Sequence, residues 1–85
     1  MEFEFTESGL NSLKKLDNST AKNILKKIKY WESADNPLKF AIPLKDRQGY
    51  FRFKVAKNWR VIVAVNYKAS RLEILEIGHR SSIYE

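Results

Sequence analysis

Three apolar segments in the second half of the chain decide the fold: GYFRFKV at residues 49–55, WRVIVAV at residues 59–65 and RLEILEIGHRSSIY at residues 71–84. Short polar stretches separate them. Apolar runs of strand length with polar breaks are typical of antiparallel strands that follow one another in a sheet. We therefore predict an antiparallel meander in this part of the chain.

Alternation along the first segment separates charged from apolar side chains. Successive side chains of a strand point to opposite faces, so Arg52 and Lys54 share one face. Phe51, Phe53 and Val55 take the other face. The sheet is thus expected to have one apolar face and one basic face.

The other two segments differ in regularity. In the second, alternate residues divide between two faces, with Trp59, Val61, Val63 and Val65 on one and Arg60, Ile62 and Ala64 on the other. The third, from about Arg71 to Ile77, alternates poorly, which indicates either a central strand covered on both sides or a β-bulge. Gly78 is expected to end this strand.

The first half of the chain predicts one strand and two helices. Phenylalanine alternates with glutamate in residues 1–6, as in a half-buried strand. Thr6 or Ser8 can cap a first helix that carries leucines at positions 10, 13 and 16, and residues 17–19 are expected to separate it from the next. A second helix is expected from about Thr20 to Ser33, because its apolar residues form one continuous stripe: Ala21, Ile24, Leu25, Ile28 and Trp31.

The segment after the second helix completes a single α+β domain over residues 1–85. Asp35-Asn36-Pro37 ends the helix, because the residue before a proline is pushed out of the helical region, and residues 38–44 can form a short edge strand. The expected order is β-α-α-β-β-β, with the helix hairpin lying across the sheet. We expect eight apolar residues in one core: Phe5, Leu25, Ile28, Phe51, Phe53, Trp59, Val61 and Val63.

Charge is distributed unevenly along the chain. The formal net charge is +6, of which residues 1–43 carry +1 and residues 44–85 carry +5. An excess of cations on the strand-rich half favours a polyanionic partner such as nucleic acid, although basic residues can also simply solvate a domain. There is no cysteine, no secretory signal and no apolar run that could span a membrane, so we expect a cytoplasmic protein without a membrane partner.

Several catalytic arrangements are poorly supported. The chain contains no Gly-rich phosphate loop and no GxSxG motif, and one histidine without cysteine makes a metal site or metal cofactor unexpected. Glu73 and Glu76 are three residues apart on a strand and are expected on opposite faces, which makes them a poor carboxylate pair. A lone histidine at a strand end, His79, is more typical of a structural role.

A cluster of cations with one tyrosine offers a different chemistry. Arg52, Lys54 and Arg60 come from adjacent predicted strands, and Arg80 and Tyr84 come from the tail. Guanidinium groups bind phosphate through two oxygens and can stabilise the charge that develops in phosphoryl transfer without a metal. A lysine or tyrosine could act as a base only if neighbouring positive charge lowered its pKa from the usual value of roughly 10. Residue types alone favour nucleic-acid binding over catalysis.

The layout of one strand, two helices and a meander that ends in Gly-His-Arg-x-x-x-Tyr resembles the RelE/ParE superfamily of toxins. The matching segments are LKDRQGYFRFKV, WRVIVAV and LEIGHRSSIY. The resemblance implies a mainly antiparallel sheet with both helices on one face and the first strand beside the last. Its RelE branch implies a cofactor-free endoribonuclease that cuts mRNA in the ribosomal A site, where a 2′-OH attacks the adjacent phosphorus and leaves a 2′,3′-cyclic phosphate.

Catalytic roles follow from the same resemblance, by position. In the RelE branch, basic residues of the first meander strand match Arg52 and Lys54, and the arginine that begins the next strand matches Arg60. The arginine and tyrosine of the tail match Arg80 and Tyr84. Arg52 stands where the RelE branch has a lysine. Because arginine stays protonated, Lys54 or Tyr84 is expected to act as the general base. Three further cations are expected to bind RNA: Lys45, Arg47 and Lys57.

The resemblance leaves two toxin activities open. A ParE-like toxin poisons DNA gyrase without cutting RNA and commonly lacks the full set of basic residues and tyrosine, whose presence here favours the ribonuclease. Both imply a cognate antitoxin as partner, and the ribonuclease also implies the ribosome and mRNA. A plain nucleic-acid-binding module is the third interpretation.

Overall fold

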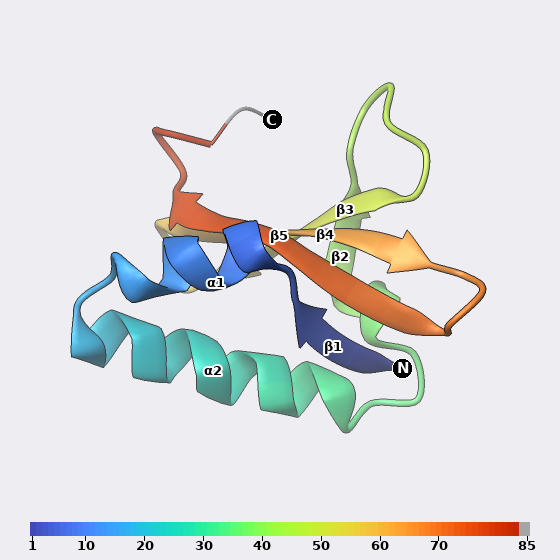
Figure 1. Ribbon diagram of the computed structural model, residues 1–85, viewed down its shortest axis with the longest axis horizontal. Coiled ribbons are helices and arrows are strands. Elements are labelled where there is room, and N and C mark those ends of the chain that lie inside the picture. Colours follow the sequence, from blue (N-terminus) through green and yellow to red (C-terminus); the bar gives the residue numbers. More distant parts are fainter. Residues whose placement is uncertain (84–85) are drawn as a thin grey trace.

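The computed structural model describes residues 1–83, which form a five-stranded sheet, two α-helices and one short 3-10 helix (Figure 1). The elements in chain order are β1 (Glu2–Phe5), α1 (Glu7–Lys14), α2 (Asn18–Glu32), η1 (Pro37–Phe40), β2 (Ala41–Pro43), β3 (Tyr50–Val55), β4 (Trp59–Asn66) and β5 (Arg71–His79). Both helices lie on one side of the sheet. The predicted α+β class and element order are confirmed.

The strand order β1-β5-β4-β3-β2 places the first strand beside the last. The pairs β2–β3, β3–β4 and β4–β5 are antiparallel, and β1 pairs with β5 in parallel. Short connections, of which the loop of residues 44–49 is the longest, explain the antiparallel pairs, whereas the parallel pair needs a long crossover, which the two helices supply. The expected edge strand exists as β2, although residues 37–40 form η1 instead of extended chain.

The core lies between the apolar face of the sheet and α2. Its buried side chains come from α2 and from the three long strands: Ile24, Ile28, Trp31, Phe53, Val55, Val61, Val63, Leu72, Ile74 and Ile77. Phe51 and Trp59 are partly buried against this core, as is Phe5. The predicted register of β3 is therefore confirmed.

One of the eight predicted core residues is misplaced. Leu25 belongs to the apolar stripe of α2, yet its side chain is 41% exposed. A helix that lies on a sheet buries a narrower stripe than the one that 3.6-residue periodicity marks out. In α2 the buried positions are 24, 28 and 31, and Leu25 falls beside them at the margin of the contact.

A β-bulge explains the irregular alternation of β5. Val63 pairs with Ile74 and Ile62 pairs with Glu76, so Leu75 is the extra residue between two consecutive positions of β4. The insertion shifts the parity of β5, so Ile77 returns to the core face that Ile74 occupies. The bulge was one of the two interpretations that the sequence left open.

Helix and strand limits differ from the sequence-based ones by a few residues. Thr6 caps α1, since its hydroxyl accepts a hydrogen bond from the backbone N–H of Gly9 at 3.1 Å. Residues 18 and 19 belong to α2 rather than to the linker. Gly78 does not end β5, which continues to His79 because Gly78 and His79 still pair with β4.

Candidate functional site: the basic face of the sheet

The face of the sheet opposite the helices is the candidate site. It is overlooked by the C-terminal tail on one side and by the loop of residues 44–49 on the other (Figure 1). Lys54 on β3 pairs directly with Arg60 on β4, and Arg52 pairs with Ile62. Paired residues lie about 5 Å apart and alternate residues of one strand about 7 Å apart. We call these three cations, Arg52, Lys54 and Arg60, the basic face.

The cations of the basic face differ in exposure. Lys54 is exposed and Arg52 is half-buried, but Arg60 is only 7% exposed. Nη1 of Arg60 donates hydrogen bonds to the carbonyl oxygen of Trp59 at 3.0 Å and to that of Lys57 at 3.4 Å. These bonds direct the guanidinium toward the β3–β4 turn. Arg60 therefore stabilises the turn in addition to any role toward a phosphate.

The tail begins on the same turn. The backbone N–H of Arg80 donates to the carbonyl of Asn58 at 2.7 Å, and the Arg80 side chain is exposed. Three residues later, Ile83 is buried against Gly78. These contacts place Arg80 at the end of the sheet where Lys54 and Arg60 lie. Tyr84, the remaining candidate catalytic residue, lies outside the described residues.

His79 lies away from the basic face. It pairs with Trp59, whose ring meets the imidazole edge-on at a centroid distance of 5.5 Å. Nδ1 of His79 is 2.8 Å from the hydroxyl of Ser81 and accepts a hydrogen bond from the Ser81 backbone N–H. These contacts support the structural role that the sequence favoured for this histidine.

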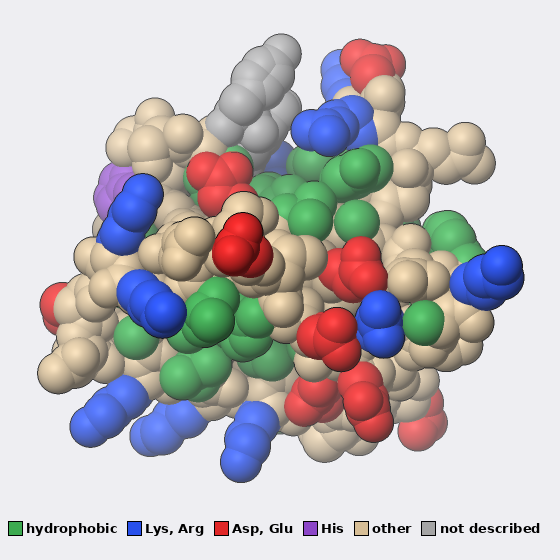
Figure 2. Space-filling view, in the orientation of Figure 1, with side chains coloured by type: hydrophobic (Ala, Val, Ile, Leu, Met, Phe, Trp, Pro, Cys, Tyr) green, Lys and Arg blue, Asp and Glu red, His purple; other side chains and the backbone are tan. Residues whose placement is uncertain are grey.

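The three cations predicted to bind RNA surround the basic face in loops. Lys45 and Arg47 are exposed in the 44–49 loop, and Lys57 is exposed in the β3–β4 turn. The guanidinium of Arg47 stacks 4.3 Å from the ring centre of Tyr50. Figure 2 shows Lys and Arg side chains on this loop beside hydrophobic side chains of the sheet. The loop thus offers both positive charge and flat apolar surface.

Carboxylates occupy the other half of the same face, contrary to expectation. Because of the bulge, Glu73 pairs with Ala64 and Glu76 with Ile62, so both lie on the face of Arg60. Glu73 accepts hydrogen bonds from Asn66 and Arg71, each at 3.3 Å. The prediction that the two glutamates point to opposite faces is wrong.

The uneven charge restricts where a polyanion can lie. Glu4 of β1, which is 3.7 Å from Arg71, adds to the acidic half formed with β5. The cations of the basic face lie on β3 and at Arg60 of β4, whereas Arg71 of β5 lies among the carboxylates and is paired with Glu4 and Glu73. A nucleic-acid strand is therefore favoured along β3, between the tail and the 44–49 loop, and disfavoured over β5.

Two residues with consequences for this site gave little signal in the sequence. Leu75 sets the face on which Glu76 lies, and only the broken alternation of the strand hinted at it. Ile83 fixes the tail, and a single apolar residue in a polar tail does not reveal its contact. Among residues 1–83, no cluster of three acidic or histidine side chains could hold a metal ion, and no helix is long and apolar enough to cross a membrane.

The family model of the ParE toxin of type II toxin–antitoxin systems matches residues 3–84. The match spans almost the entire chain. The chain belongs to the ParE toxin family. It is thus a toxin of a type II toxin–antitoxin system, within the RelE/ParE superfamily. Among curated proteins, none is significantly similar to it.

Solved structures share the fold of this ParE-family toxin. A chain of the toxin–antitoxin complex RelBE2 from Mycobacterium tuberculosis superposes with a TM-score of 0.76 at 21% identity, covering 93% of this chain and 96% of that one. The isolated RelE toxin of E. coli gives a TM-score of 0.70 at 18% identity, covering 92% of this chain and 82% of that one. A chain of the RelB–RelE complex from Methanococcus jannaschii gives a TM-score of 0.70 at 22% identity, covering 94% of this chain and 93% of that one.

Proposed function

We propose that this ParE-family toxin is a metal-independent endoribonuclease that cuts mRNA on the ribosome and is neutralised by a cognate antitoxin. The observation that carries the proposal is the pairing of Lys54 with Arg60 beside Arg52, with the tail anchored on the adjoining turn. This arrangement offers several cations to one phosphate. The toxin–antitoxin complexes among the similar structures support an antitoxin as partner.

The proposed reaction needs a base, an acid and groups that stabilise negative charge. The 2′-oxygen attacks phosphorus as its proton passes to the base, Lys54 or Tyr84. The bond to the 5′-oxygen then breaks, and that oxygen takes a proton from another cation. Arg52, Arg60 and Arg80 stabilise the charge on the phosphate oxygens. The products are a 2′,3′-cyclic phosphate and a free 5′-OH.

The loops have a supporting role in the proposal. Lys45, Arg47 and Lys57 contact phosphates beyond the scissile one. The stacked pair of Arg47 and Tyr50 offers a flat surface for an unstacked base. Proteins that bind single-stranded RNA commonly stack bases on aromatic rings or on guanidinium groups. The acidic half of the sheet face keeps the strand on β3.

A second candidate function is poisoning of DNA gyrase without RNA cleavage. The observation in its favour is the family model itself, which describes the ParE toxin. The two functions make different demands on the basic face. A nuclease requires Arg80 and Lys54 for chemistry, whereas a gyrase poison tolerates their replacement as long as the contact with gyrase persists.

The test uses purified toxin and ribosomes programmed with a defined mRNA. The expected result is cleavage that leaves a 2′,3′-cyclic phosphate, and loss of cleavage when the scissile nucleotide carries a 2′-deoxy sugar. Tyr84→Phe separates proton transfer from stacking, because it removes only the hydroxyl. Efficient cutting of the deoxy message contradicts the mechanism. Intact mRNA together with inhibited gyrase supercoiling supports the second function.

A further inference from the structure

His79 accepts a hydrogen bond from each of the last three residues that the structure describes. Its carbonyl oxygen accepts from the backbone N–H groups of Ser82 at 2.9 Å and Ile83 at 3.2 Å, and from the Ser82 hydroxyl at 3.0 Å. Its ring nitrogen Nδ1 accepts from the backbone N–H of Ser81 at 3.2 Å and lies 2.8 Å from the Ser81 hydroxyl. The main chain and the side chain of this histidine therefore close one turn, residues 79–83, which we call the tail turn.

The contact with Ser81 determines where the imidazole ring carries its proton. A backbone N–H can only donate, so Nδ1 of His79 has to accept and is unprotonated. The proton of the neutral ring is then on Nε2, and the Ser81 hydroxyl can donate to Nδ1 as well. A side chain that accepts from the N–H two residues further on closes an Asx-turn when the residue is asparagine or aspartate. His79 reproduces that arrangement with a ring nitrogen.

The turn that His79 closes carries Arg80. The backbone N–H of Arg80 donates to the carbonyl of Asn58 in the β3–β4 turn at 2.7 Å, and its side chain is exposed. The carbonyls on either side of Asn58 accept hydrogen bonds from Nη1 of Arg60. Three consecutive carbonyls of the β3–β4 turn thus hold the main chain of Arg80 and the guanidinium of Arg60.

The imidazole ring itself lies on the wrong side of the sheet to touch RNA on the basic face. His79 pairs with Trp59, whereas Gly78 pairs with Arg60. Neighbouring residues of a strand point to opposite faces, so the side chains of His79 and Arg60 are on different sides. The ring meets that of Trp59, which is partly buried against the core. His79 can therefore act on a bound phosphate only through the main chain that it holds.

We propose that His79 is a positioning residue for RNA cleavage. With Nδ1 as an unprotonated acceptor it closes the tail turn, and it thereby sets the direction from which Arg80 reaches the phosphate bound by Lys54 and Arg60. The inference rests on the proposed ribonuclease function. A group held in place before the substrate binds has little freedom to lose, and a small misplacement of such a group can cost a large factor in rate. His79 contributes to the rate without touching the substrate or transferring a proton.

Two amide variants separate this role from others. His79→Asn removes the ring but keeps an acceptor that can close the same turn. His79→Gln removes the ring too and carries the same amide, but one bond further from the main chain, where it no longer fits the turn. On ribosomes programmed with a defined mRNA, kcat should stay within about threefold of wild type for His79→Asn and fall about tenfold or more for His79→Gln, with KM little changed. An equal loss in both variants, or a loss in neither, overturns the proposal.

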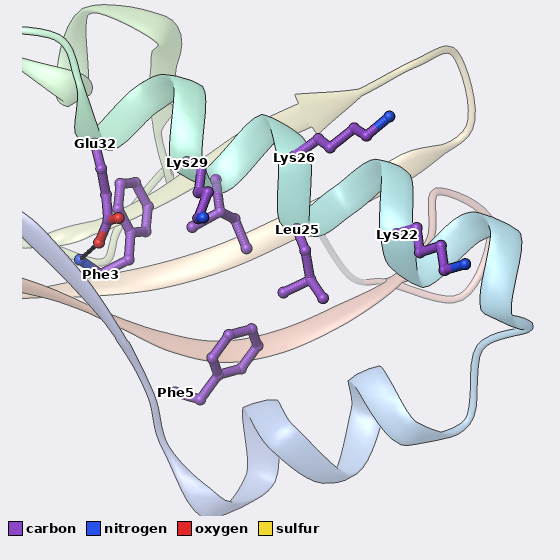
Figure 3. Close-up of a pocket in the computed structure, with 8 residues that line it drawn as sticks. Phe3, Phe5, Lys22, Leu25, Lys26, Lys29 and Glu32 are labelled. Carbon is purple, nitrogen blue, oxygen red and sulfur yellow. Dashed lines mark hydrogen bonds between the residues drawn. The ribbon is translucent and has the colours of Figure 1, made fainter.

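A second side chain that accepts from a backbone N–H provides the control for stability. Oε2 of Glu32, at the end of α2, accepts from the N–H of Phe3 in β1 at 2.7 Å (Figure 3). Glu32→Ala removes this bond on the helix side of the sheet and should lower the denaturant midpoint, as His79→Gln does. It should leave kcat unchanged, because it does not affect the tail turn. If Glu32→Ala loses as much kcat as His79→Gln at a similar midpoint, stability alone explains the loss and the positioning role is overturned.

The dependence on Arg80 is tested in a double variant. In the Arg80→Ala background, His79→Gln should lower the single-turnover cleavage rate less than about twofold, since the residue that it positions is gone. If His79→Gln lowers the rate by its full factor in this background, His79 acts independently of Arg80, which overturns the proposal.

Amide hydrogen exchange tests the tail turn without relying on catalysis. The N–H of Ser81 should exchange slowly in full-length wild type and in His79→Asn, and about tenfold faster in His79→Gln. Equal exchange rates in all three proteins overturn the turn, whether or not the toxin cuts RNA. A wild-type toxin that leaves mRNA intact but shows the expected exchange pattern contradicts the proposed function. In that case the role of His79 toward Arg80 is overturned with it, although the hydrogen bond to Ser81 is confirmed.

Discussion

Ile83 packs directly over Gly78, at the point where the tail turns back on β5. A β-carbon added at Gly78 would lie 3.0 Å from Cγ1 and 3.1 Å from Cδ1 of Ile83, which is closer than side chains normally approach. The absence of a side chain at position 78 therefore allows Ile83 to be buried. This contact holds the tail segment that carries Arg80.

The first prediction concerns this contact. Gly78→Ala should destabilise the protein by about 1 kcal/mol, since overpacking costs typically 1–3 kcal/mol and the side chain of Ile83 can shift. In the Ile83→Ala background the same substitution should cost almost nothing, because the obstructing atoms are gone. Chemical denaturation of the four variants of this cycle measures both effects. If the stability costs of Gly78→Ala and Ile83→Ala simply add in the double variant, a methyl group at position 78 does not clash with the side chain of Ile83.

The second prediction concerns Gly9, where two physical effects have opposite signs. Helix propensity alone predicts that Gly9→Ala stabilises α1 by about 1 kcal/mol. However, a β-carbon would lie 2.1 Å from the carbonyl oxygen of Ile74, a backbone atom of β5. We expect a net loss of at least ~2 kcal/mol, which lowers the Tm of a small domain by roughly 10 °C.

A matched substitution on the same helix isolates the steric effect. Asn11 is exposed in α1, so Asn11→Ala should raise the Tm slightly through helix propensity. Scanning calorimetry of both variants gives the comparison. A Gly9→Ala protein as stable as wild type would mean that α1 can move away from β5 without cost.

The sequence was sufficient to predict the faces of β3 and β4 because alternation is local. Phe53 and Val61 are buried as the period of two requires, and their pairing follows from the short turn between the strands. The broken alternation of β5 had two possible explanations from the sequence, a central strand covered on both sides or a β-bulge, and the bulge at Leu75 was only one of them. An irregular strand shows broken alternation, but the residue without a partner is defined only by the register of the neighbouring strand.

The candidate site was predictable in composition but not in detail. The pairing of Lys54 with Arg60 follows from the turn length, whereas the burial of Arg60 depends on carbonyls that point back from the turn. The exposure of Leu25 likewise depends on how α2 lies on the sheet. Tertiary geometry of this kind is not encoded in the spacing of residue types.

The third prediction tests whether the basic face is a defined RNA site. Binding of a short single-stranded RNA should weaken with salt, with a log–log slope of about −0.7 per phosphate contacted. Lys54→Ala should reduce the slope by about that amount. Lys26→Ala removes the same charge from the helix side and should leave it unchanged. Fluorescence anisotropy over a salt series measures the slopes, and equal changes from both variants would indicate diffuse attraction.

The last prediction separates two arginines that have the same proposed chemistry but different surroundings. Lysine keeps the charge of arginine but loses the planar fork that contacts two phosphate oxygens. Arg60→Lys and Arg80→Lys should therefore each slow mRNA cleavage, on the order of 10²–10³-fold if the contact is as important as a typical oxyanion donor.

Stability should distinguish the two variants. Arg60 is buried and donates part-buried hydrogen bonds to the carbonyls of Lys57 and Trp59, so losing these bonds from a charged donor should cost about 1.5–3 kcal/mol. The Arg80 side chain is exposed, so Arg80→Lys should keep the wild-type free energy of unfolding. Cleavage rates and denaturant midpoints measured on the same preparations check both points. Full activity of Arg80→Lys would exclude a contact of the Arg80 guanidinium with two phosphate oxygens. If Arg60→Lys loses stability but cleaves mRNA at the normal rate, the role of Arg60 is limited to stabilising the β3–β4 turn.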